Sequence, residues 1–219
     1  MNKTDLQLKD EIETELHFDP RVNAAQIGVT VDQGAVSLLG TVDTYAERFA
    51  AEDAAKRVSG VRTLAQDLAV KLTTPHKRND SEIAIAVENA LKWDVYVPDS
   101  IKAKVQHGMV TLEGLCGWNY EREAAERSVR FLTGVTTVFN VVTIKPTASV
   151  ESVKEKVEAA LQRQATADAS SIKIDTSGGK VTLSGSASSW RSIRDAANAA
   201  WAAPGVTDVV DHMKISFAP

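Results

Sequence analysis

The sequence contains a single cysteine, Cys116, among its 219 residues. One thiol cannot form an intramolecular disulfide, and it cannot supply a cysteine-cluster metal site. Cys116 follows directly on an expected strand, where a small buried side chain is more common than a reactive thiol. We therefore predict that Cys116 packs in a core.

The sequence also lacks a long hydrophobic run and an export signal. A membrane-spanning helix needs about 18 or more apolar residues in succession, and no such stretch occurs. The N-terminus, Met-Asn-Lys-Thr-Asp-Leu-Gln-Leu-Lys-Asp, has no apolar signal-peptide segment and enters a helical pattern at once. These observations predict a protein without a transmembrane segment, located in the cytoplasm.

No part of the chain carries an excess of positive charge. The formal net charge is −4 overall, with −5 over residues 5–72, −2 over residues 80–145 and 0 over residues 148–219. Proteins that bind nucleic acid use lysine and arginine side chains to neutralise phosphates. The charge balance therefore argues against a nucleic-acid partner.

Residues that could support catalysis do not form a recognisable pattern. The histidines occupy unrelated positions in a helix end, a linker, a turn and a last strand: His17, His76, His107 and His212. None has the spacing of a metal site or of a catalytic triad. The Gly178-Gly179 pair lacks the Gly-x-x-x-x-Gly-Lys pattern of a phosphate loop. We expect no catalytic residue, metal or cofactor, and interpret the protein as a non-enzyme.

One short motif, in contrast, occurs three times. Residues 34–40 read Gly-Ala-Val-Ser-Leu-Leu-Gly, residues 108–114 read Gly-Met-Val-Thr-Leu-Glu-Gly, and residues 179–185 read Gly-Lys-Val-Thr-Leu-Ser-Gly. A Gly-Val step begins 26 residues after the first glycine in every copy. The glycines that recur are Gly34, Gly40, Gly60, Gly108, Gly114, Gly134, Gly179, Gly185 and Gly205. Periods of 74 and 71 residues indicate a tandem array of one small unit.

The first copy illustrates the elements that each unit is expected to form. Leu8, Ile12 and Leu16 recur every four residues, which predicts a helix over residues 4–17. Apolar residues alternate on both sides of a glycine-containing turn at residues 32–34, which predicts an antiparallel hairpin whose second strand ends at Gly40.

A second helix and a third strand complete the expected unit. Thr44 and Glu47 have the spacing of a capping box, and the alanine-rich helix that they begin is expected to end near Ser59-Gly60, with Gly60 in the C-cap position. Residues 64–70 then form the third strand. The sequence thus predicts an α+β fold of three αββαβ units, over residues 5–72, 80–145 and 148–217. In each unit, two helices cover one face of a small three-stranded mixed sheet.

The repeated run Gly-x-Val-x-Leu-x-Gly, followed by an alanine-rich helix and a Gly-Val-x-x-Val step, resembles the BON domain (bacterial osmotically induced and nodulation domain). The resemblance covers nearly the whole chain, and the later step reads Val135-Thr-Thr-Val138 and Val206-Thr-Asp-Val209 in two copies. It implies an αββαβ fold and a non-catalytic module that binds phospholipid surfaces or other ligands, linked to osmotic or envelope stress. Many relatives are periplasmic, which makes the periplasm the alternative location. The motif itself is structural, so no site residue follows from it.

The second unit differs most from its neighbours and supplies the candidate site. Aromatic residues follow its first helix and begin its second helix, and two lysines alternate with core positions on its first strand. Tryptophan and tyrosine flanked by lysine are typical of contacts with a lipid interface. The lipid-binding candidates are Lys92, Trp93, Tyr96, Lys102 and Lys104. The alternative is that Trp93 and Tyr96 pack between units or within the core.

Two other classes of function remain open at this point. Three small units on short linkers could close around a small ligand or a cation such as potassium, with acids such as Asp32 or Asp175, although no EF-hand spacing occurs. The repeats could also present an extended surface to another protein. The sequence does not distinguish the oligomeric state.

Overall fold

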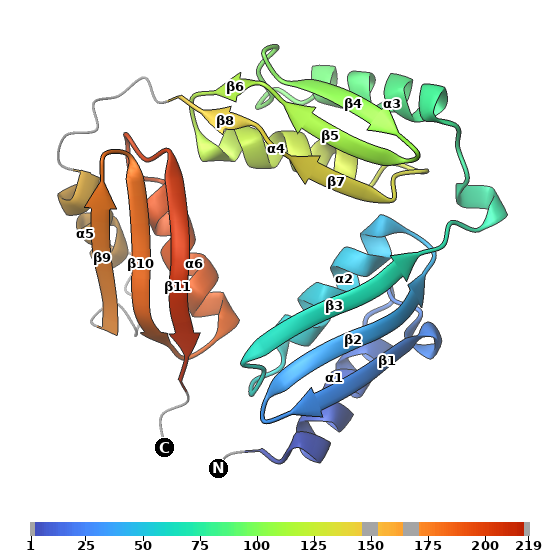
Figure 1. Cartoon of the computed structure of the whole chain (residues 1–219), viewed down its shortest axis with the longest axis horizontal. Coiled ribbons are helices and arrows are strands. Elements are labelled where there is room, and N and C mark those ends of the chain that lie inside the picture. Colours follow the sequence, from blue (N-terminus) through green and yellow to red (C-terminus); the bar gives the residue numbers. More distant parts are fainter. Residues whose placement is uncertain (1–2, 146–152, 164–170, 217–219) are drawn as a thin grey trace.

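The structure is a computed structural model that describes residues 3–145, 153–163 and 171–216. Three units follow one another along the chain, each with its own sheet and helices (Figure 1). The first unit contains α1 (Asp5–Phe18), β1 (Ile27–Asp32), β2 (Ala35–Val42), α2 (Tyr45–Arg57) and β3 (Thr63–Val70). Short 3₁₀ helices, Ala24–Gln26 and Thr74–His76, precede β1 and the second unit.

The other two units repeat this order. The second contains α3 (Asp80–Trp93), β4 (Lys102–Gln106), β5 (Met109–Glu113), β6 (Leu115–Cys116), α4 (Asn119–Arg130), β7 (Thr137–Asn140) and β8 (Thr143–Ile144). The third contains α5 (Val153–Arg163), β9 (Ile172–Ser177), β10 (Lys180–Ala187), α6 (Trp190–Trp201) and β11 (Asp208–Ile215). The predicted α+β fold of tandem αββαβ units is confirmed.

In each unit the middle strand pairs with both others. β2 is antiparallel to β1 and parallel to β3, and the same relation holds around β5 and β10. The helix between the second and third strands carries the chain back across the sheet, which is what a parallel pair requires. The three-stranded sheet of each unit is therefore small and mixed, as predicted, and in the second unit β6 and β8 add a separate parallel pair.

Two predicted element ends are wrong. β2 does not end at Gly40 but continues to Val42, because Gly40 adopts a φ of +128° and stays paired with Ile27. The equivalent glycine of the second unit, Gly114, does interrupt its strand, which ends as β5 and resumes as β6. α2 ends at Arg57, before the positive-φ residue Gly60.

The predicted capping box at the start of α2 is half right. The Thr44 hydroxyl accepts a hydrogen bond from Glu47 N at 3.1 Å. The Glu47 carboxylate accepts from Asp43 N at 2.8 Å and from Asn23 N at 2.7 Å. Glu47 thus ties the helix to the loop that precedes β1, a tertiary contact that the local pattern does not reveal.

Each unit has its own apolar core between the sheet and the two helices. Alternate strand residues such as Val36, Leu38 and Leu112 are at most 1% exposed, and the small alanines of the second helices bring those helices close to the sheets. Cys116 belongs to the core of the second unit at 5% exposed, and burial raises the pKa of its thiol. The prediction for Cys116 is confirmed.

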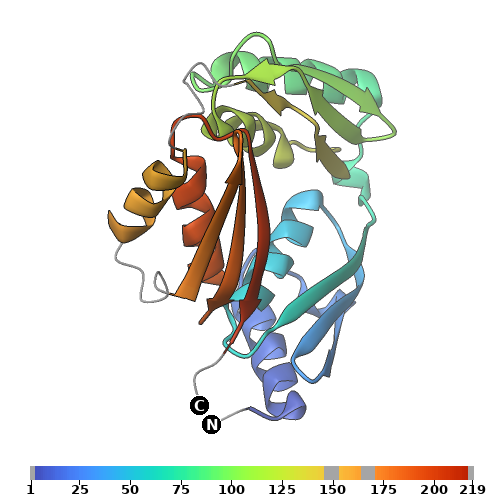
Figure 2. The ribbon, with the colours of Figure 1, turned by 60° about the vertical axis from the view of Figure 1, so that its left-hand side comes forward.

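The second helices α2, α4 and α6 lie on the inner side of the molecule, where the three units meet (Figures 1 and 2). Lys56, Arg130 and Trp201 occupy one equivalent position, since each lies 22 residues after the first glycine of its motif. Each of these side chains makes a cation–π contact with the second helix of another unit.

These contacts close a cycle. Lys56 Nζ lies 5.5 Å from the centre of the Trp190 ring, so the first unit contacts the third. The Trp201 ring lies 4.7 Å from Arg122 Cζ, so the third contacts the second, and Arg130 Cζ lies 4.0 Å from the Phe49 ring, so the second contacts the first. Head-to-tail contacts that close in this way form a ring, here within one chain.

Candidate functional site

Trp93 is the most exposed tryptophan of the second unit because of its register on α3. Ile83, Val87 and Leu91 form the buried stripe of this helix, four residues apart. Trp93 lies two residues beyond Leu91, about 200° around the helix, and its side chain is 88% exposed. The interpretation that Trp93 packs between units or in the core is therefore wrong.

The loop after α3 holds further aromatic residues at the surface. Asp94 accepts a hydrogen bond from Ser128 Oγ at 2.7 Å and one from Tyr96 N at 3.0 Å, which fixes the loop against α4. The bond from Ser128 is the main reason why the pKa of Asp94 lies below its ordinary value. Tyr96 remains 58% exposed, and its ring is perpendicular to that of Tyr120, with the two ring centres 6.0 Å apart. The loop is thus ordered yet open to solvent.

Trp118 and Tyr120, at the start of α4, extend this surface. Their rings stack with centres 6.5 Å apart, and Tyr120 is 52% exposed. Val95 adds an aliphatic side chain that is 89% exposed. We call Trp93, Val95, Tyr96 and Tyr120 the aromatic edge of the second unit.

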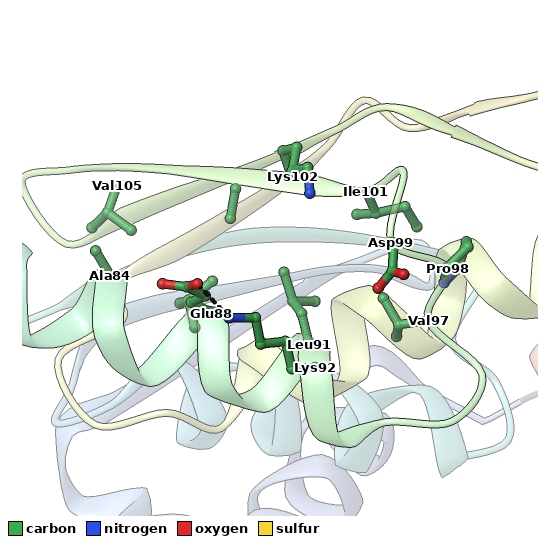
Figure 3. Close-up of a pocket in the computed structure, with 12 residues that line it drawn as sticks. Ala84, Glu88, Leu91, Lys92, Val97, Pro98, Asp99, Ile101, Lys102 and Val105 are labelled. Atoms are coloured by element: carbon green, nitrogen blue, oxygen red, sulfur yellow. Dashed lines mark hydrogen bonds and ion pairs between the residues drawn. The ribbon is translucent and has the colours of Figure 1, made fainter.

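Lys92 and Lys102 line a cavity of about 300 Å³ between α3 and β4, next to the aromatic edge (Figure 3). Its walls are apolar side chains such as Val87, Leu91 and Val97. The cavity contains Ala103 where the equivalent residues of the other units are the larger Val29 and Ile174. The sequence did not lead us to predict the cavity, although the smaller side chain at this position of the second repeat indicates unfilled space.

The structure brings two of the five lipid-binding candidates, Lys92 and Lys102, to one cavity, and two more follow Lys92 in the chain. Lys92, Trp93 and Tyr96 lie around the end of α3, and Lys102 begins the adjacent strand. Lys104 is also exposed, but it lies further along β4, beside Thr111. It therefore flanks the sheet rather than the cavity.

The charge around the aromatic edge is mixed. Lys92 Nζ lies 2.7 Å from Glu88 Oε1, and this contact raises the pKa of Lys92 and lowers that of Glu88. Asp99 also lines the cavity, and Glu113 lies opposite Lys102 on β5. A surface of this kind attracts an anionic partner only moderately, so apolar contact would have to contribute most of the binding.

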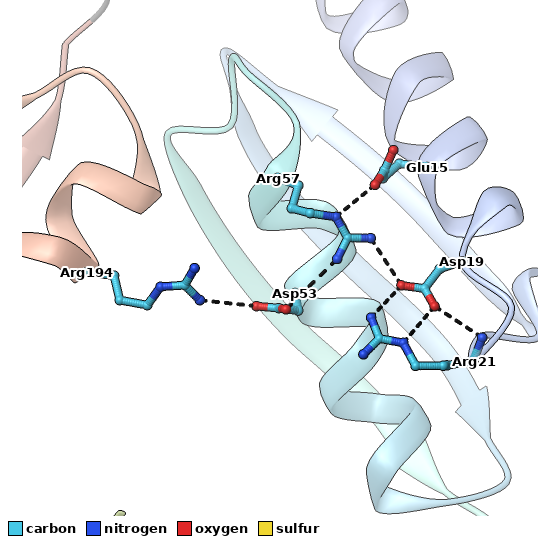
Figure 4. Close-up of polar contacts among 6 residues, drawn as sticks. All are labelled: Glu15, Asp19, Arg21, Asp53, Arg57 and Arg194. Carbon is cyan, nitrogen blue, oxygen red and sulfur yellow. Dashed lines mark hydrogen bonds and ion pairs between the residues drawn. The ribbon is translucent and has the colours of Figure 1, made fainter. Parts of the chain in front are cut away.

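The equivalent edge of the first unit presents one exposed aromatic side chain, and the residue that follows it belongs to an ion-pair network (Figure 4). Phe18 is 79% exposed at the end of α1, where Trp93 ends α3. The next residue, Asp19, has a side chain only 4% exposed and accepts hydrogen bonds from Arg21 Nε and Nη2 at 2.8 and 2.7 Å. Arg57 adds a third at 3.1 Å, and these guanidinium groups, Arg21 first, hold the pKa of Asp19 well below its usual range.

We expect Asp19→Asn to lower the free energy of unfolding by about 1–3 kcal/mol at pH 7, because charge-assisted hydrogen bonds become neutral ones. Since the folded-state pKa is lowered, the carboxylate stabilises the fold fully above about pH 5 and loses that effect as the pH falls below about 4. Urea unfolding of wild type and Asp19→Asn, at pH 7 and again below about pH 4, measures this pH dependence. A difference between the two proteins that is unchanged at low pH would contradict it.

The control is Glu15→Gln, since Glu15 Oε1 pairs with the same Arg57 at 2.8 Å but on the surface. An exposed pair of this kind contributes roughly 0–1 kcal/mol. We therefore expect a smaller loss of stability than for Asp19→Asn.

The described ranges offer no support for a metal centre. No group of three or more histidine, cysteine, aspartate or glutamate side chains within them is arranged to hold an ion. Nor does any described helix combine the length and the apolar character needed to span a bilayer.

Comparison with known proteins gives a family and little else. The family model for the BON domain matches residues 4–71, 79–146 and 149–216. A search of curated proteins finds no match. A structure of CdsD, a structural protein of the type III secretion system of Chlamydia trachomatis, is 13% identical, with 95% of this chain and 92% of that chain covered and a TM-score of 0.27. The PrgH periplasmic domain is 10% identical over 87% and 95% of the two chains, with a TM-score of 0.24.

Proposed function

The chain belongs to the BON domain family, and on that premise we propose that it is a non-catalytic binding protein whose second unit contacts an anionic phospholipid surface. The observation that carries the proposal is the aromatic edge, where Trp93 at the end of α3 is 88% exposed and Val95 in the following loop is 89% exposed. Large apolar side chains that are exposed together favour an interaction surface.

Lipid is the favoured partner because of how the aromatic and basic groups are combined. Tryptophan and tyrosine rings are suited to the headgroup region of a bilayer, where one end of the ring meets apolar chains and the other meets water. Lys92 and Lys102, beside the edge, carry ammonium groups on long apolar stems that can reach phosphates. The protein would contact the membrane only at its surface, and no segment of the chain would cross the bilayer.

The expected location is the cytoplasm, with the periplasm as the alternative, and a role in osmotic or envelope stress is part of the same proposal. The cytoplasmic leaflet of a membrane carries anionic lipids that attract basic side chains. A potassium or other cation sensor lacks a comparable observation in the described residues.

The test is co-sedimentation with vesicles of phosphatidylglycerol mixed with phosphatidylcholine, compared with phosphatidylcholine alone. We expect Trp93→Ala combined with Tyr96→Ser to weaken binding to the anionic vesicles at least about tenfold, since burying one large apolar side chain contributes about 1.5–3 kcal/mol. Binding should also weaken between low and physiological salt.

Phe18→Ala is the matched control, because Phe18 ends the equivalent helix of the first unit and is 79% exposed. It should leave binding unchanged if the second unit alone contacts lipid. Equal losses in both variants would assign the contact to the first unit as well as the second, and no loss in the double variant would remove the aromatic edge from the site.

A further inference from the structure

A second cavity lies between the first and third units, away from the aromatic edge. Its volume is about 690 Å³, within the roughly 300–1,000 Å³ typical of sites for small organic molecules. α2 and α6 supply most of its lining, so it exists only where the two units meet. Small-molecule sites occur preferentially at such boundaries between domains. We call it the inter-unit cleft.

The apolar part of the cleft is aromatic. Phe49 from α2 and Trp190 and Ile193 from α6 line it. Trp190 is held in place by a hydrogen bond from its Nε1 to Val61 O at 3.0 Å and by Lys56, whose Nζ lies 5.5 Å from the ring centre. A flat apolar group can therefore lie against a preformed aromatic wall without ordering it first.

The polar part of the cleft has more cations than acids. Four lysine or arginine residues and three acids line it: Lys56, Arg57, Arg191, Arg194, Glu52, Asp53 and Asp211. Two of the four cations are closely paired, Lys56 with Glu52 at 2.5 Å and Arg57 with Glu15 and Asp19.

Arg191 and Arg194 are held loosely, Arg191 by an ion pair of 3.9 Å to Asp195 within α6 and Arg194 by an ion pair across the boundary between the units. The guanidinium of Arg194 extends from α6 toward Asp53 on α2, with Nη1 3.7 Å from Oδ1, and its side chain is 65% exposed (Figure 4). An ion pair so long and so exposed contributes little. Arg194 can therefore turn to an incoming anion, and a carboxylate or sulfonate would accept two hydrogen bonds from its planar fork.

We propose that the inter-unit cleft binds an organic anion with a flat apolar body, the body against Trp190 and Phe49 and the anionic group on Arg194. Such a ligand touches two units at once. It would therefore stabilise the closed arrangement of the first and third units by mass action.

The test is a fluorescence titration of the full chain with anilinonaphthalene sulfonate. Phenylnaphthylamine, which has the same aromatic body without the sulfonate, is the neutral comparison probe. We expect Arg194→Gln to weaken binding of the sulfonate about tenfold, as the loss of one charge-assisted hydrogen bond predicts. Binding of the neutral probe should not change.

Asp53→Asn is the matched control, because it removes the same inter-unit ion pair but leaves Arg194 free. It should leave sulfonate binding unchanged or make it tighter. A loss equal to that of Arg194→Gln would show that the ion pair only holds the units together, which overturns the proposal. An absence of sulfonate binding, or binding that disappears in the Trp93→Ala, Tyr96→Ser variant, would also overturn the proposal.

Discussion

Replacing Gly114 with alanine is expected to cost the second unit about 2–6 kcal/mol and so a large part of its stability. Gly114 has a φ of +133°, a conformation that side chains rarely adopt, which costs about 1–3 kcal/mol. An added Cβ would also lie 2.2 Å from the carbonyl oxygen of Ser100. That neighbour is backbone and cannot turn aside, so the strands must shift, at a further cost of about 1–3 kcal/mol.

This loss is large on the scale of one unit. A unit of this size has a total stability of about 4–10 kcal/mol, if each residue contributes 0.05–0.15 kcal/mol. Urea unfolding followed by circular dichroism should therefore show an early transition in Gly114→Ala that wild type lacks.

Gly178→Ala separates the two causes of the loss. Gly178 also has a positive φ, of +60°, but an added Cβ there would meet nothing within 4 Å. It should cost only about 1–2 kcal/mol, the usual penalty of left-handed backbone. If Gly114→Ala proved no more harmful than Gly178→Ala, the close approach of the Ser100 carbonyl would not be what requires glycine.

Replacing Trp190 with alanine is expected to separate the first and third units. The indole donates to Val61 O, contacts Lys56 and packs against the core of the first unit, all across the boundary. Truncation of a buried tryptophan costs about 3–5 kcal/mol, and this half-buried one about 2–4 kcal/mol. Most of that loss falls on the contact between units, because the core of the third unit is formed by other residues.

Small-angle X-ray scattering measures the separation directly. Trp190→Ala should raise the radius of gyration, while Trp190→Phe keeps a ring on the first unit and should stay close to wild type. Trp93→Ala is a second control, since an 88% exposed side chain makes little difference to stability. If Trp190→Ala stayed as compact as wild type, the other contacts between the units would be sufficient to hold them together without the Trp190 side chain.

Local patterns predicted the elements of each unit because those elements depend on local causes. The four-residue stripe Leu8, Ile12 and Leu16 is fully buried in α1, and the hairpin turn has a positive φ at Gly34 as expected. Element ends were less predictable where tertiary contacts decide them. Gly40 is a glycine inside a strand rather than at its end because the backbone of Gln26 leaves no room for a Cβ there, which no local pattern shows.

The ring of units could not be predicted from the repeat. The residues that close it, Lys56, Arg130 and Trp201, are equivalent in position but differ in chemistry, so they do not stand out as a motif. At two boundaries the residue at this position is the cation, Lys56 or Arg130, whereas at the third it is the aromatic residue, Trp201. The inter-unit cleft was hidden for the same reason, since its walls come from opposite ends of the chain.

The candidate site was partly readable. The sequence indicated which residues could meet a lipid surface, but not that Trp93 leaves the core, because exposure depends on its register relative to Leu91. It also did not show that Glu88 pairs with Lys92 and so reduces the basic character of the edge.

The central proposal, that the aromatic edge of the second unit enters the lipid interface, is tested most directly by fluorescence quenching with brominated lipid. Bromine atoms quench a tryptophan only at close range, so vesicles of brominated phosphatidylglycerol report which indole meets the bilayer. The chain has four tryptophans, and we expect quenching in wild type that largely disappears in Trp93→Phe. Quenching that persists unchanged in Trp93→Phe, or no quenching of wild type, would contradict the proposal.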